Sequence, residues 1–182
     1  RKRSMAERLR RAVANGSLDV FSQPIRALHD RRLVGAEALA RWSDRNGDAF
    51  SPAEFIPLAE RLGLLEDLTK VVLTKVCADL GDRLRGDNAF YVSVNVAPEQ
   101  VVSPEFRSFM RNLLLKAGIP AASVALEVTE RSTSDFKDLS AAFQELRGEG
   151  HRVMIDDFGT GYSNFAYLTQ LPLDVIKMDQ VF

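Results

Sequence analysis

Five side chains with oxygen donors stand at or near the ends of strand-like segments, where they could hold metal ions: Glu37, Asn95, Glu127, Asp156 and Asp157. Carboxylate and amide oxygens, without histidine or thiolate, suit magnesium, manganese or calcium better than zinc. The adjacent carboxylates of Asp156 and Asp157 would repel each other in a buried place unless positive charge compensates them. Two cations a few ångströms apart would do so, and such a pair can activate a water in phosphodiester cleavage.

Two cationic residues could act on phosphate beside these oxygens. Strand alternation places Arg41 on the same face as Glu37 and Leu39, and a guanidinium can hold a phosphate with two hydrogen bonds. Lys177 could orient a water or offset negative charge. Taken singly, a strand-end acid is more often a salt-bridge or capping residue, and a lysine an ordinary ion-pair partner. The alignment of five oxygen ligands with two cations favours metal-dependent phosphate chemistry.

Strand-like and helix-like segments alternate along the chain. Strands are expected over 18–25, 32–42, 89–97, 123–130, 152–157 and 173–179, and helices over 51–65, 68–80, 103–118, 136–150 and 163–171. This α/β alternation, with polar residues at strand ends, predicts a mostly parallel sheet and a TIM-like barrel. A doubly wound open sheet is the alternative, but it would usually show a glycine-rich phosphate turn after its first strand. Only six strands are expected, so an eight-stranded barrel would be incomplete.

Composition limits the class of protein. The chain has 182 residues, 46% of them hydrophobic, and a formal net charge of -1. This suits one domain and argues against a nucleic-acid polymer as partner. No apolar run reaches the roughly 18 residues of a membrane helix, so no direct membrane insertion is expected. Cys77 is the only cysteine and is expected to be a small helix residue. We therefore expect a cytoplasmic domain.

Short motifs resemble a known family. "EALARW", from Glu37 to Trp42, is similar to the signature of the EAL domain, the bacterial phosphodiesterases that open cyclic di-GMP. The segments "SQPI", "FIPLAERLGLL", "SVNVAPEQ", "LEVTE", "DDFGTGYSN", "LPLD" and "IKMD" also occur in the family's order and at compatible spacing. They cover residues 18–182.

The resemblance implies a fold and a metal site. Family members are TIM-like barrels whose first strand runs antiparallel to the others. Glu37, Asn95, Glu127 and Asp156 match the ligands of one divalent metal, and Asp157 matches a ligand of a second. The implied cofactors are therefore Mg²⁺ or Mn²⁺, two in each complete site.

The resemblance also implies roles for further residues. Lys177 matches the lysine near the nucleophilic water, and Asp179 an aspartate that supports the metal site. The substrate-contacting positions of the family are matched by Gln23, Leu39 and Arg41. Residues 158–164 match a mobile loop that couples dimerisation to activity, and Glu130 matches the glutamate that anchors it. A homodimer is expected.

The chain departs from the family in two places. Asn164 stands where the family usually has serine, and two further strands, with a glutamate and a glutamine of the site, are missing after Phe182. We expect a partial EAL domain over 17–182, with open sheet edges that favour self-association. The basic segment 1–16 is expected to be a linker helix from an upstream GGDEF or sensory domain. The whole could be the cytoplasmic part of a larger, membrane-anchored protein.

Three functions compete at this stage. The first is metal-dependent hydrolysis of cyclic di-GMP to linear pGpG in bacterial second-messenger signalling, for which every upstream catalytic position is intact. The second is a non-catalytic cyclic di-GMP-binding or regulatory module, which the missing C-terminal residues favour for this chain. The third takes Asp157–Gly159 as the DFG motif of a kinase. It fails, because the glycine-rich loop, strand lysine and catalytic loop of kinases are missing.

Overall fold

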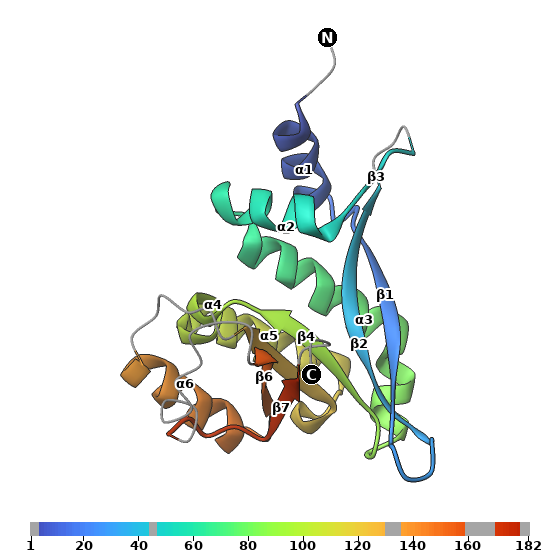
Figure 1. Ribbon diagram of the computed structural model, residues 1–182, viewed down its shortest axis with the longest axis vertical. Coiled ribbons are helices and arrows are strands. Elements are labelled where there is room, and N and C mark those ends of the chain that lie inside the picture. The colour runs from blue at the N-terminus through green and yellow to red at the C-terminus, as the bar shows by residue number, and fades with distance from the viewer. Residues whose placement is uncertain (1–3, 44–46, 130–135, 159–169, 179–182) are drawn as a thin grey trace.

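A single curled sheet organises the chain in the computed structural model, which describes residues 4–43, 47–129, 136–158 and 170–178 (Figure 1). The strand order is β1-β2-β4-β5-β6-β7, and β3 pairs with β2 outside this path. The strands are β1 (Asp19–Arg26), β2 (Leu33–Ser43), β3 (Ala49–Phe50), β4 (Tyr91–Val96), β5 (Val124–Thr129), β6 (Arg152–Phe158) and β7 (Val175–Met178).

The strand directions confirm the predicted TIM-like arrangement. β1 is antiparallel to β2, whereas β2, β4, β5, β6 and β7 form parallel pairs. Pro24 lies in β1 opposite Ala36, and an edge strand tolerates proline because one side of its backbone needs no partner. The sheet is curled as half a barrel, with the parallel strands ending toward the same side.

Helices pack beside the sheet and above it in the view of Figure 1. They are α1 (Met5–Ala14), α2 (Pro52–Arg61), α3 (Leu65–Gly86), α4 (Pro98–Val102), α5 (Pro104–Ala117) and α6 (Phe136–Gly148). Local chemistry sets their ends: Ser51 and Glu54 form a reciprocal capping box before α2. Gly118 ends α5 in the left-handed conformation, at φ 65°, which glycine adopts without a Cβ clash. The start of α2 and the end of α5 agree with the predicted boundaries.

The core lies between these helices and the strands. Val92, Val94 and Val96 of β4 share one face of the strand and are buried. At the far end of β2, Trp42 is 2% exposed and stacks on Phe50, with ring centroids 4.1 Å apart. Arg8 of α1 lies over Phe50, 4.8 Å from the ring centroid. The first helix is thereby attached to the β2–β3 hairpin.

Several elements were not predicted from the sequence. β3 has only two residues, α4 only five, and a 3-10 turn, η1 (Ala121–Ser123), precedes β5. The expected helix over 163–171 falls almost entirely outside the described residues. No helix within the described residues is long and apolar enough to cross a membrane.

Candidate active site

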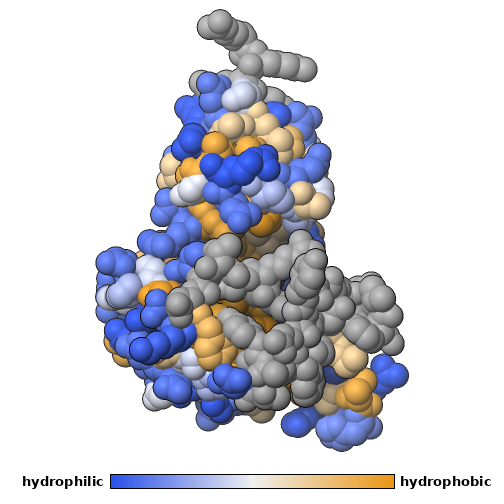
Figure 2. All heavy atoms as spheres, turned by 60° about the vertical axis from the view of Figure 1, so that its left-hand side comes forward, coloured by the Kyte–Doolittle hydropathy of each residue, from blue (hydrophilic) through white to orange (hydrophobic). Residues whose placement is uncertain are grey.

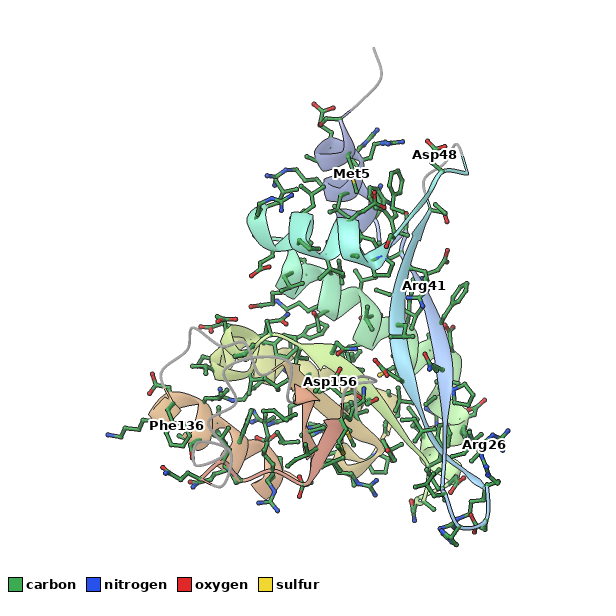
Figure 3. The ribbon with its side chains drawn as sticks, viewed as in Figure 1. Met5, Arg26, Arg41, Asp48, Phe136 and Asp156 are labelled. Atoms are coloured by element: carbon green, nitrogen blue, oxygen red, sulfur yellow. The ribbon has the colours of Figure 1, made fainter. Side chains whose placement is uncertain are left out.

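Side chains from five strands meet at the carboxyl end of the sheet. Glu37 comes from β2, Asn95 from β4, Glu127 from β5, Asp156 from β6 and Lys177 from β7. Figure 3 shows Asp156 at the upper end of β6, facing the space that the curled sheet encloses. The parallel register pairs Asn95 with Glu127, so these two side chains stand at the same height in the sheet.

A lysine joins the carboxylates. The Nζ atom of Lys177 lies 2.5 Å from Glu127 Oε2, 3.1 Å from Glu37 Oε2 and 3.5 Å from Asp156 Oδ1. Asn95 Nδ2 donates a hydrogen bond of 3.0 Å to Glu37 Oε1. One oxygen from each of the three carboxylates lies within 4.8 Å of the other two. The expected convergence of these side chains is therefore present.

The electrostatics keep the lysine charged. Burial acts to lower the pKa of Lys177, but hydrogen bonds and charge from Glu127 and Glu37 outweigh it and raise that pKa. Burial raises the pKa of the Glu127 carboxyl, while Lys177 opposes the rise. Ser93 also favours the charged form of Glu127, although its hydroxyl makes no hydrogen bond of ordinary geometry within the described part of the chain. The charged ammonium group of Lys177 thus lies among three carboxyl groups.

The residues present fit a divalent cation. Three carboxylates and one ammonium carry a formal charge of -2, which one divalent ion would neutralise. Glu127 Oε1 is buried and has no hydrogen-bond partner within the described residues, so a lone pair is left without compensation. All donors are oxygens, the set that Mg²⁺ and Mn²⁺ prefer.

Arg41 follows Glu37 along β2, and Figure 3 shows it higher in the view than Asp156. Its Nη1 donates a hydrogen bond of 2.9 Å to Ala40 O, and its guanidinium lies 5.5 Å from the ring centroid of Phe21. Asp19 is its direct neighbour in the β1–β2 ladder, yet no carboxylate pairs with Arg41 among the described residues. Its remaining donors are thus available to a phosphate.

A groove of about 400 Å³ adjoins the carboxylate cluster. Arg41 of β2 and Asn95 of β4 line it together with residues of α2, α3 and α4. Figure 2 shows apolar surface among hydrophilic residues near the waist of the molecule, below the helical upper part. A mostly apolar groove with a few polar groups is typical of ligand sites.

Sequence reasoning missed the residue that fixes one wall of this groove. Gln100 is 4% exposed, and its Oε1 accepts a hydrogen bond of 2.6 Å from the backbone N–H of Ala97. Its Nε2 donates to Leu65 O at 3.3 Å. The turn that follows Asn95 is thereby attached to α3. The signal available in the sequence was a glutamine three residues after residue 97, where the strand was expected to end.

Of the other predicted site residues, the structure describes some and not others. Gln23 and Leu39 lie in the β1–β2 ladder, where Gln23 is opposite Glu37 and Phe21 is opposite Leu39. Glu130 and Asp179 lie outside the described residues. Asp157 belongs to β6, but its side chain also lies outside them. The second predicted metal site therefore stays a prediction.

Known proteins share this sequence pattern. The EAL domain family model matches residues 6–182. The chain is 38% identical over its whole length to probable cyclic di-GMP phosphodiesterase PdeB of Escherichia coli (strain K12), of which it covers 35%. It is 38% identical over 98% of its length to cyclic di-GMP phosphodiesterase NbdA of Pseudomonas aeruginosa, of which it covers 23%. The chain thus spans about a third or less of these relatives.

Solved structures share the fold. The PaMucR phosphodiesterase in complex with c-di-GMP has a TM-score of 0.86 and 31% identity, over 95% of this chain and 71% of that one. The EAL enzyme Bd1971 in its cAMP- and cyclic-di-GMP-bound form has a TM-score of 0.87 and 29% identity, over 97% of this chain and 50% of that one. By its sequence and its fold, the chain belongs to the EAL domain family.

Proposed function

We propose that this chain carries the catalytic strands of a metal-dependent phosphodiesterase that hydrolyses cyclic di-GMP to linear pGpG. The observation that carries the proposal is the convergence of Glu37, Glu127 and Asp156 around Lys177, with Asn95 beside them. Relatives named as cyclic di-GMP phosphodiesterases support the choice of substrate.

Glu37, Asn95, Glu127 and Asp156 would hold one Mg²⁺ or Mn²⁺, and Asp157 would contribute to a second. Bound divalent ions lower the pKa of water and offset charge on phosphate oxygens. Lys177, protonated beside the carboxylates, would orient the attacking water and face the negative charge that develops on the phosphate.

The reaction needs a held phosphate and a defined line of attack. Arg41 has guanidinium donors to spare and would hold a phosphate oxygen of the substrate. Water oxygen then bonds to phosphorus while the bond from phosphorus to the 3′ oxygen breaks, and that oxygen takes up a proton. The product is the linear dinucleotide with a 5′ phosphate. The groove beside Asn95 and Arg41 offers space for the rest of the substrate.

Other predictions stay open at this point. The homodimer, the upstream GGDEF or sensory domain and the boundary between residues 16 and 17 remain predictions. α1 packs against the domain through the buried side chains of Leu9, Ala12 and Val13. Any upstream domain would therefore connect to a helix that is already fixed on the β2–β3 hairpin.

Hydrolysis of cyclic di-GMP by this chain, followed by chromatography with Mn²⁺, Mg²⁺ or EDTA, tests the proposal. We expect pGpG from the parent with either metal and none in EDTA or from Glu37→Ala. Asp82→Asn, which changes an exposed carboxylate on α3, is the matched control and should keep the parent rate. If the chain binds cyclic di-GMP in the presence of metal but forms no product, it is a binding module and not an enzyme. If the chain shows no binding and no product, both the phosphodiesterase and the binding module are overturned.

A further inference from the structure

An aromatic side chain on β1 stands open to solvent beside the site. Phe21 is 60% exposed, and among the large apolar side chains that the structure shows as exposed it is the aromatic one. Leu28 and Leu115 are also exposed, at 93% and 71%, but they lie in the β1–β2 turn and on α5. The ring is therefore accessible to a ligand that approaches this edge of the sheet.

The strand register places this ring on the face that carries the site. Phe21 is directly opposite Leu39, and Gln23 is opposite Glu37. Residues opposite each other in an antiparallel ladder project to the same face, and alternate residues along β2 share it. Phe21 therefore projects with Leu39 and Arg41, two residues along the strand from the level of the carboxylate of Glu37.

The partner of the ring indicates the kind of ligand. The guanidinium of Arg41 lies 5.5 Å from the ring centroid of Phe21, and no carboxylate pairs with it among the described residues. An arginine that can hold phosphate beside an exposed aromatic ring is the combination by which proteins bind nucleotides: the cation takes the phosphate and the ring takes a base.

We propose that Phe21 stacks on one purine base of the cyclic dinucleotide while Arg41 holds the adjoining phosphate, so that Phe21 determines affinity for the substrate. This inference rests on the proposed function. Because the ring touches the base and not the reacting phosphate, its loss should raise KM and leave kcat nearly unchanged. Metal affinity should not change, because Phe21 contacts no carboxylate of the cluster.

The test measures cyclic di-GMP binding, Mn²⁺ binding and Tm for the parent chain and three variants. Phe21→Ala should weaken dinucleotide binding at least about fivefold. Phe21→Tyr keeps the ring and should bind like the parent. Phe21→Leu keeps apolar bulk without the ring and should resemble Phe21→Ala. Mn²⁺ affinity and Tm should stay at the parent values in all three.

Leu28→Ala is the matched control, because it removes an exposed apolar side chain from the same hairpin, and it should bind like the parent. Parent-like binding by Phe21→Ala, or full binding by Phe21→Leu, would overturn the stacking role while leaving the phosphodiesterase proposal intact. A parent chain that binds no cyclic di-GMP with Mn²⁺ present would overturn the proposed function and this inference together. The two failures are thus distinguishable.

Discussion

The two ends of the parallel strands bury polar groups in opposite ways. At the amino end, His151 Nδ1 lies 3.1 Å from Val124 O, and Asp174 Oδ2 accepts a hydrogen bond of 2.9 Å from the N–H of Val153. Arg147 pairs with the same Asp174. At the carboxyl end, Glu127 Oε1 is buried without a hydrogen-bond partner among the described residues. These polar groups of the amino end have partners, whereas the carboxyl end keeps one buried carboxylate oxygen without one among the described residues.

The difference shows where stability and chemistry reside. Buried polar groups with partners hold strands in register, whereas crowded carboxylates cost stability unless a cation compensates them. In barrels of this type the carboxyl ends of strands carry the catalytic residues, and the opposite ends serve the fold. Substitutions at the two ends should therefore differ in their dependence on metal.

Lys177→Met should give the largest change. Without its ammonium, three carboxylates within 4.8 Å lose the cation that they contact. We expect the free energy of unfolding in EDTA to fall by about 2–3 kcal/mol, less than for a fully buried pair because the Lys177 side chain is 28% exposed. Urea denaturation measures this, and adding Mn²⁺ should recover part of the loss.

Lys70 offers the control for this experiment. Its side chain is also 28% exposed, and it pairs with Glu66 one helical turn away on α3. Lys70→Met should cost about 0.5 kcal/mol or less, with no effect of Mn²⁺. Equal losses for the two variants in EDTA would mean that the carboxylate cluster needs no special compensation.

Asp174→Ala tests the amino end. The buried N–H of Val153 would lose its acceptor and Arg147 its partner, which should cost about 1–3 kcal/mol. Because this site lies away from the cluster, the loss should be the same in Mn²⁺ and in EDTA. Urea denaturation under both conditions measures it, with Asp82→Ala on the exposed face of α3 expected to cost under about 0.5 kcal/mol. A loss that Mn²⁺ repairs would contradict the division between the two ends.

Local patterns predicted a large share of this architecture. Alternation predicted that Arg41 shares a face with Glu37 and Leu39, because side-chain direction in a strand depends only on the parity of the position. The expected start of a helix at residue 51 is confirmed, and the capping box of Ser51 and Glu54 that sets it involves only neighbouring residues. These features are set within a few residues.

Other features depend on distant parts of the chain. The hydrogen bond from Lys177 to Glu37 joins residues 140 positions apart and forms only because the sheet curls. The link from Gln100 to α3 depends on how α4 docks, and the contact of Phe21 with Arg41 on the β1–β2 register. None of these contacts can be placed from the neighbouring residues alone. Longer-range geometry thus decides which predicted side chains meet.

Asp156→Asn tests whether the carboxylates at the carboxyl end repel one another. The change removes one of three mutually repelling charges and keeps the shape of the side chain. Without metal, the free energy of unfolding should rise by up to about 1 kcal/mol. Titration with Mn²⁺ should show at least tenfold weaker binding. Asp79→Asn, on the exposed face of α3, should change neither quantity, whereas a less stable Asp156→Asn in EDTA would contradict the repulsion that we infer.

The pH dependence of stability gives a further test of the amino end. His151 is 4% exposed, and burial lowers the pKa of its imidazole, although the carbonyl of Val124 and the charge of Glu149 act in the opposite direction. The unfolded chain, in which histidine titrates near 6.5, therefore binds the additional proton first as pH falls. Stability from the neutral ring is complete above that value and is lost below it, by at most about 1.4 kcal/mol per pH unit.

Urea denaturation at pH 7.5 and 5.5 should therefore show a smaller loss for His151→Gln than for the parent chain. Other groups contribute to both measurements, and the carboxyl end adds a contribution of opposite sign, because burial raises the pKa of Glu127. The difference between parent and variant isolates the buried imidazole. His29→Gln, which replaces an exposed ring in the β1–β2 turn, controls for a changed histidine count. If the parent and His151→Gln lose the same stability, the stability of the amino end does not depend on a neutral histidine.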